Sequence, residues 1–80
     1  MRILIHGYYG AGNARDDAIL QAMVDRFHRV VPGARITVVV RSQTIPAYQG
    51  PHEIQTVLGS NLDGVYQAVR TADVVVIGGG

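Results

Sequence analysis

The feature that most constrains this chain is the alternation of strand-like runs with helix-like segments. Four short runs rich in β-branched residues occupy residues 3–5, 36–40, 54–58 and 74–77, and the first of them stops at Gly7. Alternation of this kind is typical of α/β folds, in which helices join parallel strands. Right-handed crossovers and the commonest arrangement of such sheets predict the strand order 3-2-1-4.

The segments between the runs carry helical periodicity. The first helix is expected from about Asn13 to Val31, and Pro32-Gly33 ends it. Ser60 or Asn61 is expected to cap the second helix. Apolar residues recur at three- and four-residue spacing and form one face of each helix: Ile19, Leu20, Met23, Val24, Phe27 and Val31 on the first, and Leu62, Val65, Tyr66 and Val69 on the second.

Glycine-rich segments follow the two strands that the predicted order places side by side. The first and fourth strands become neighbours, with their helices on opposite faces, and their carboxyl ends flank the crevice in which open α/β sheets bind ligands. Residues 7–12 and 78–80 supply glycines at both ends. Glycine permits close backbone approach, and a helix N-terminus offers free N–H groups to an anion. This coincidence predicts a ligand site, whereas the bare alternative is a strand-to-helix turn that needs glycine only for its backbone angles.

The first glycine segment matches neither of two familiar phosphate-binding motifs. Its order, Gly7-x-x-Gly10-x-Gly12, differs from the dinucleotide fingerprint, and Asn13 stands where a P-loop has lysine. Asn13 and Asp16 have the spacing of a capping box, in which each side chain satisfies a backbone N–H group of the helix start. Both side chains would also lie at the mouth of the crevice, where they could touch substrate hydroxyls, and the two roles are compatible.

Other side chains near the strand ends are weaker candidates. Arg41 ends the second strand, where an NADP enzyme binds the 2′-phosphate, although a solvated arginine is the simpler interpretation. Tyr8 and Tyr9 could stack on a sugar or base, or pack beside the turn. His6 follows the first run and could face the crevice. None of the three histidines has metal-ligand spacing with another histidine or acid, so no metal site is predicted.

Composition excludes several classes of function. The chain has no cysteine, which excludes a disulfide, a thiolate zinc site and a cysteine nucleophile. A net charge of +1 without a Lys/Arg run argues against a nucleic-acid partner. No apolar stretch approaches the ~18 residues of a membrane helix, so we expect a soluble, cytoplasmic segment.

Eighty residues make one small domain. The predicted order leaves the fourth strand at an open edge, which is an aggregation hazard unless more chain covers it. We therefore expect residues 1–80 to be an incomplete Rossmann-like N-terminal domain, cut in the loop after its fourth strand.

Two segments of the chain resemble one known family. The run from Gly7 to Leu20, GYYGAGNARDDAIL, resembles the opening motif of the polysaccharide pyruvyl transferase family, with Arg15 in place of a usual glycine and Asp17 in place of a usual glutamate. The end of the chain, from Ala72 to Gly80, resembles the family's second N-terminal signature, a hydrophobic strand that runs into a glycine loop.

The resemblance implies the N-terminal half of a GT-B-like two-domain transferase with its active site between the domains. The enzyme would move the enolpyruvyl group of phosphoenolpyruvate onto sugar hydroxyls of a cell-surface polysaccharide or its lipid-linked precursor, and no cofactor is expected. By the same resemblance, the donor-binding residues are expected mainly in the C-terminal domain of the same chain. This half would supply the acceptor side and the glycine-lined wall, with substrate-binding residues Tyr8, Tyr9, Gly10, Gly12, Asn13, Asp16, Gly78, Gly79 and Gly80.

Two alternatives stay open at the level of sequence. One is a GT-B glycosyltransferase that uses a nucleotide sugar, and the other is a nucleotide-binding Rossmann module in which Arg41 selects NADP. Peripheral association of the intact enzyme with the inner face of the membrane also stays open.

Overall fold

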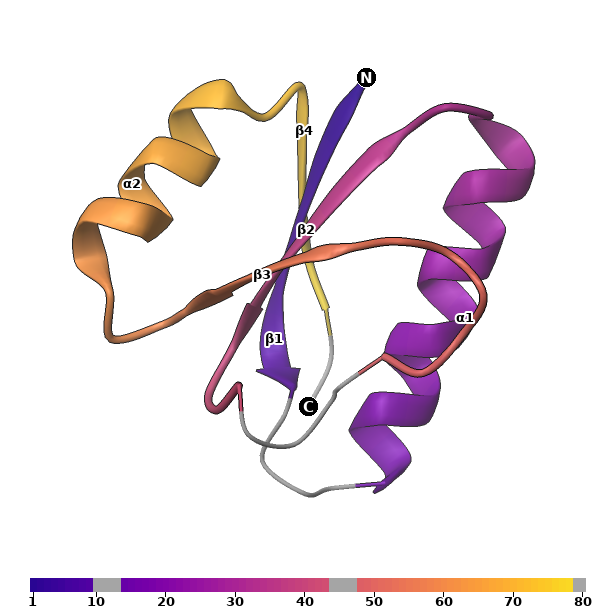
Figure 1. Ribbon diagram of the computed structural model, residues 1–80, viewed down its shortest axis with the longest axis horizontal. Helices are drawn as coiled ribbons and strands as arrows, with labels where there is room; N and C mark the ends of the chain where they lie inside the picture. The colour runs from indigo at the N-terminus through magenta and orange to yellow at the C-terminus, as the bar shows by residue number, and fades with distance from the viewer. Residues whose placement is uncertain (10–13, 44–47, 79–80) are drawn as a thin grey trace.

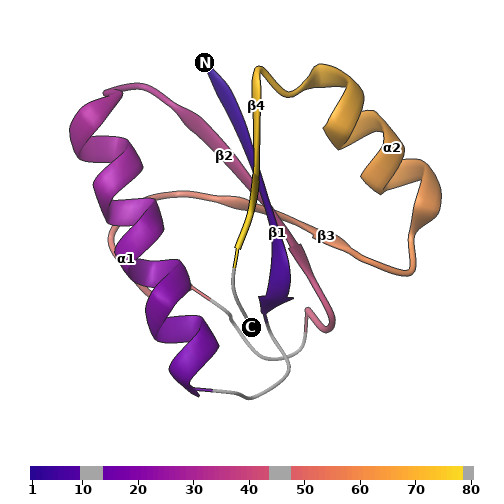
Figure 2. The ribbon, with the colours of Figure 1, turned by 180° about the vertical axis from the view of Figure 1, so that it is seen from behind.

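The described part of the chain forms one parallel sheet with a helix on each face. The computed structural model describes residues 1–9, 14–43 and 48–78 (Figure 1). In chain order these residues form β1 (Arg2–Tyr9), α1 (Ala14–Val30), β2 (Arg35–Val40), β3 (Gln55–Leu58), α2 (Leu62–Thr71) and β4 (Val74–Ile77). The sheet order is β3-β2-β1-β4 and all pairings are parallel. Figure 2 shows from behind that α1 and α2 lie on opposite sides of the sheet. The predicted α/β class, the strand order and the opposite placement of the helices are therefore confirmed.

The main core lies between α1 and the sheet. Alternate residues of the two central strands turn toward α1, since successive strand side chains point to opposite faces. Leu20 and Val24 of α1 meet them, and both are fully buried. The buried cluster consists of Ile3, Ile5, Leu20, Val24, Ala34, Ile36, Val38 and Val40. Leu4 and Val39, at intervening strand positions, are also buried, so β1 and β2 are covered on both faces as parallel strands usually are.

The first helix follows the sequence closely. The described part of the helix is Ala14–Val30, so it ends one residue before the expected Val31, and the expected start at about Asn13 lies outside the described residues. Gly33 takes the positive φ of 84° that glycine adopts readily after a helix end. Ile19 is the exception within the predicted apolar face, because its side chain is 40% exposed. The core side of α1 is therefore centred on Leu20 and Val24, with Met23, Phe27 and Val31 packed against the cluster.

The second helix departs from the prediction. Asn61 caps it, because its Oδ1 accepts a hydrogen bond from the Gly64 N–H group at 3.1 Å. A helix normally packs its apolar face on the core, but here Leu62, Tyr66 and Val69 are 76%, 62% and 48% exposed. Its half-buried residues are mostly small, namely Gly64, Val65 and Ala68, and Ala72, which follows the helix, is half-buried as well. Gly64 comes so close to β3 that an added Cβ would lie 3.1 Å from a methyl carbon of Val57. The small side of α2 thus lies on the sheet, and the larger apolar side chains face outward.

Two further observations concern the length of β1 and the exposure of β4. The expectation that the first strand stops at Gly7 is wrong, because its backbone continues to Tyr9 and pairs there with Val40 after an irregularity in register. The fourth strand pairs with β1 alone, and Ile77 is 81% exposed. Within the described residues β4 is therefore an open edge, as predicted. No described helix is both long and apolar enough to cross a membrane.

Candidate functional site

The carboxyl ends of the strands gather at one edge of the sheet. Pairing of β1 with β4 places His6 beside Ile77, and the Gly78 N–H group donates a 2.8 Å hydrogen bond to the His6 carbonyl oxygen. On the other side, the Gly59 N–H group donates to the Val40 carbonyl oxygen at 2.9 Å. Both hydrogen bonds extend the strand pairing beyond the strand ends. Because Gly78 is bonded to His6, the glycine segment after β1 and the one after β4 begin side by side.

A hollow of about 460 Å³ lies at this edge. Its lining comes from the end of β1, the end of β2 and the turn into α2: His6, Gly7, Val39, Val40, Arg41, Gly59 and Ser60. The volume is within the range of small-molecule sites, ~300–1,000 Å³. An imidazole, a guanidinium and a hydroxyl are the polar side-chain groups of the lining, and all three can donate hydrogen bonds. The hollow therefore suits a small ligand that carries hydroxyls or negative charge.

Two further hollows lie at the opposite, amino edge of the sheet. One of about 190 Å³ lies under α2 and is lined partly by Arg2 and Arg35, and one of about 510 Å³ is lined partly by His28 and Glu53. The hollow of about 510 Å³ is slightly larger than the one at the carboxyl edge, but volume alone does not show which hollow binds a ligand. Ligands of open α/β sheets bind at the carboxyl ends of the strands, and only that edge receives both glycine segments.

For most of the predicted site residues the structure does not describe a side-chain position. Gly10, Gly12, Asn13, Gly79 and Gly80 lie outside the described residues. Tyr8 and Tyr9 are described through their backbone, as the last two residues of β1. Gly78 is described, and its N–H group is the one bonded to His6.

Asp16 is the one predicted side chain that the structure describes fully. It lies in the first turn of α1 and is only 7% exposed, and it is the single charged residue buried among those described. The first turn is a favourable place for a carboxylate, because unpaired N–H groups and the positive end of the helix dipole face it. The burial of Asp16 favours a role in holding the helix start, and leaves little of its surface for a ligand to touch.

His6 and Arg41, two of the weaker candidates, line the same hollow. Both side chains are exposed. They come from neighbouring strands at positions far apart in sequence, and the parallel pairing of β1 with β2 brings the strand ends together. The imidazole of His6 and the guanidinium of Arg41 therefore line one hollow, which the sequence analysis did not predict.

A polar cluster on α1 was missed by the sequence analysis. The Tyr48 hydroxyl donates to Asp25 Oδ1 at 3.0 Å and accepts from the His52 backbone N–H group at 3.3 Å. The rings of His28 and His52 stack with centroids 4.1 Å apart, and His52 Nε2 lies 3.8 Å from Asp25 Oδ1. Burial, with a smaller contribution from Asp25, raises the pKa of Tyr48 above its ordinary value. The cluster holds the segment before β3 against α1.

The contacts of this cluster join α1 to the segment before β3. Among the described residues no group of three His, Asp or Glu side chains could hold a metal ion. The Nε2 atom of His28 is buried and has no hydrogen-bond partner in the described part of the molecule. The sequence places Asp25 and His28 three residues apart, on one side of the helix, which is the one signal of this cluster. Nothing in the sequence predicts that residues 48–52 fold back onto α1.

Comparisons with protein-family models, with curated proteins and with solved structures find no match to this chain.

Proposed function

We propose that this chain is the N-terminal part of a polysaccharide pyruvyl transferase, with a GT-B-like second domain following it. The proposal rests on the two sequence signatures, residues 7–20 and 72–80. The observation that carries it furthest is the pairing of β1 with β4, which brings the strand ends of both signatures to one edge, joined by the hydrogen bond from Gly78 to His6. Two signatures of one site are expected to converge in this way.

The reaction is the formation of a cyclic ketal from phosphoenolpyruvate and two hydroxyls of one sugar. Both sugar oxygens form bonds to C2 of the donor, the bond from C2 to the phosphate oxygen breaks, and the methylene carbon gains a proton and becomes a methyl group. The two hydroxyls give up one proton each: one proton goes to the methylene carbon, and the other goes to the phosphate oxygen, so that hydrogen phosphate leaves. In this proposal the present half binds the acceptor, and the C-terminal domain holds the donor.

The described residues suit an acceptor-binding role. A sugar presents hydroxyls that donate and accept hydrogen bonds, and the hollow offers His6 and Ser60, which can do both. Arg41 is placed at the same hollow and would favour a phosphate-bearing acceptor, such as a lipid-linked saccharide. Asp16 is buried in the first turn of α1, so in this proposal it positions the start of that helix instead of binding the acceptor directly.

Phosphate release by the full-length protein tests the proposal. We expect release from phosphoenolpyruvate only when a sugar acceptor is present. His6→Gln should lower kcat/KM for the acceptor by about tenfold, the size of one hydrogen bond lost in the transition state. His52→Gln is the matched control, because it makes the same change in the cluster on α1, away from the hollow, and should leave kcat/KM unchanged. Phosphate release without any acceptor, or none with a broad panel of acceptors, would contradict the proposal.

A nucleotide-binding role is the second candidate, favoured by Arg41 at the hollow. In dinucleotide-binding folds the end of the second strand contacts the ribose or its phosphate, and a GT-B glycosyltransferase would bind a nucleotide sugar. Thermal unfolding of the full-length protein separates the two functions, because a ligand stabilises the state that binds it. Stabilisation by a nucleoside diphosphate and not by phosphoenolpyruvate would select a glycosyltransferase, and stabilisation by NADPH that Arg41→Ala removes would select the dinucleotide module.

A further inference from the structure

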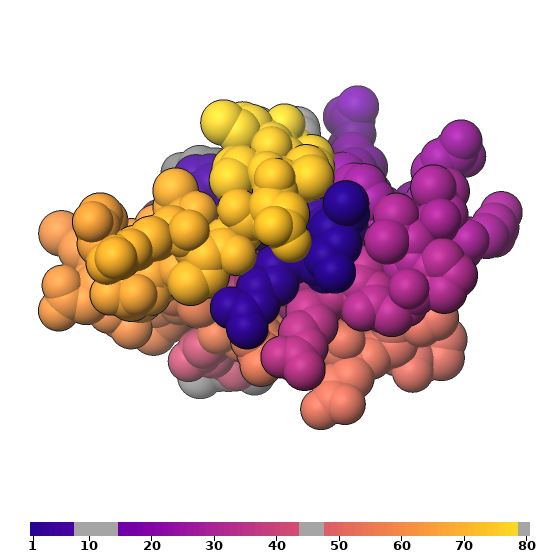
Figure 3. Space-filling model, turned by 90° about the horizontal axis from the view of Figure 1, so that it is seen from above, coloured from indigo at the N-terminus to yellow at the C-terminus, as the bar shows by residue number. Residues whose placement is uncertain are grey.

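The outward face of α2 carries an apolar stripe. Leu62, Tyr66 and Val69 are all about half exposed or more, and their spacing of four and three residues places them within ~60° of arc on the helix. Figure 3 shows from above that α2 (orange) projects from the molecule on the side away from α1. Three large apolar side chains together on one exposed helix face are typical of a surface that binds another protein.

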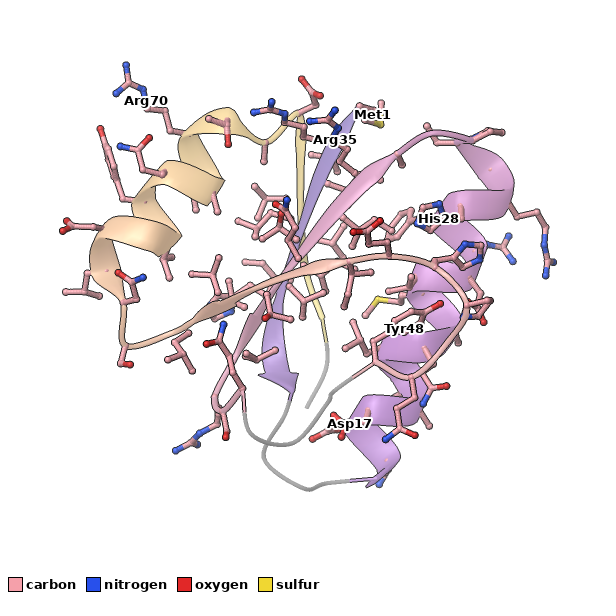
Figure 4. The ribbon with its side chains drawn as sticks, in the orientation of Figure 1. Met1, Asp17, His28, Arg35, Tyr48 and Arg70 are labelled. Atoms are coloured by element: carbon pink, nitrogen blue, oxygen red, sulfur yellow. The ribbon has the colours of Figure 1, made fainter. Side chains whose placement is uncertain are left out.

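Two charges of opposite sign lie along one side of this stripe. Asp63 lies in the first turn of α2 and Arg70 in the last, and both are exposed. They are seven residues apart, so they lie on the same flank of the helix, ~10 Å from each other along its axis. Arg70 points away from the body of the molecule (Figure 4). Neither charge forms an ion pair with another side chain of the described residues.

This pattern of charge is complementary to itself. If a second α2 is laid antiparallel against the first, about a twofold axis near Tyr66, Asp63 of each copy faces Arg70 of the other. The same operation places Leu62 against Val69 of the other copy, and Tyr66 against Tyr66. An interface made by a twofold axis must use one patch twice, and the stripe with its two flanking charges meets that requirement.

We propose that the outward face of α2 binds a second copy of this chain, as an antiparallel helix pair with two reciprocal ion pairs between Asp63 and Arg70. The interface is small, so the dimer is weak, with a Kd on the order of 100 µM. The two ion pairs are exposed at the rim, and salt therefore weakens the dimer. The open edge of β4 is a different surface, and association through it would not depend on these charges.

Sedimentation equilibrium of the full-length protein over a concentration series, at low and high salt, tests the proposal. Asp63→Arg and Arg70→Asp should each weaken dimerisation about tenfold or more, because each places like charges opposite one another. An equal mixture of the two variants should restore it, since one partner then offers two arginines and the other two aspartates. Tyr66→Ser should weaken both the wild-type dimer and the mixed dimer of the two charge variants, because this residue lies at the centre of the interface. Far-UV circular dichroism checks that each variant keeps its helices.

Restoration in the mixture is the decisive result, because a variant that merely fails to fold cannot be rescued by a partner. Three outcomes would each overturn the proposal. The wild-type chain stays monomeric to millimolar concentration, or it associates equally well in both charge variants, as pairing of β4 edges would, or the mixture associates no better than its components.

Discussion

The two helices should respond very differently to the same substitution, Leu→Ala. Leu20 of α1 is fully buried in the main core, whereas Leu62 of α2 is 76% exposed although the sequence assigns both to apolar helix faces. Removal of a buried leucine side chain costs its transfer free energy and leaves a cavity, about 3–5 kcal/mol in a core that cannot collapse. Leu62 hides about a quarter of its surface, so Leu62→Ala should cost about 0.5 kcal/mol. The expected difference in the free energy of unfolding is therefore at least ~2 kcal/mol.

Urea denaturation followed by circular dichroism measures this difference. A domain of 80 residues has a stability on the order of 4–12 kcal/mol, so Leu20→Ala removes a large share and shifts the midpoint strongly. The slope against urea should stay the same in both variants, since the surface exposed on unfolding hardly changes. Protein concentration must stay low, so that self-association through α2 contributes nothing. Equal costs for the two substitutions would refute the assignment of Leu62 to the outside and place the stripe of α2 in the core.

Three further results are expected. Asn13→Ser in the full-length protein should keep the melting temperature and lose most of the activity, because serine caps a helix well but lacks the paired donor and acceptor of the amide; enzyme assays with thermal melts check this, and retained activity would make Asn13 a capping residue only. Asn61→Ala removes the acceptor of the Gly64 N–H group and should cost about 1 kcal/mol, seen as faster hydrogen exchange in α2 than in α1. Burial and Asp25 raise the pKa of Tyr48, so the folded state favours the neutral phenol and loses stability as the pH rises above about 10; Tyr48→Phe should flatten this loss in denaturation midpoints measured across that range, and an unchanged slope would show that Tyr48 is not its source.

The sheet was predictable from the sequence because its signals are local. Runs of β-branched residues form strands, and three connecting segments of sufficient length allow all four strands to be parallel. Right-handed crossovers then limit the possible topologies, and the commonest arrangement gives the observed strand order. Gly33 and Asn61 illustrate the same point for the helix ends, since a positive φ and a cap each depend on the residue type and its immediate neighbours.

The candidate site was predictable only as an edge of the sheet. The position of the two glycine segments followed from the strand order, and the structure gives β1 and β4 as the expected neighbours. The hollow that joins His6 with Arg41 and Ser60 needed the pairing of three strands and the course of the turn at Gly59. Those contacts are made between residues distant in sequence, and no local pattern encodes them.

By itself the sequence determined the elements, their order and the edge of the sheet that the glycine segments follow, because propensity, periodicity and chirality act within each segment or between consecutive ones. Tertiary structure alone decided which side of α2 is buried. Periodicity predicted the stripe of Leu62 and Tyr66, but Gly64 and Ala68 lie on the sheet, since small side chains let a helix approach closely. It also decided that Tyr48 meets Asp25, because a segment that returns to a helix finds its partner only when the chain has folded around it.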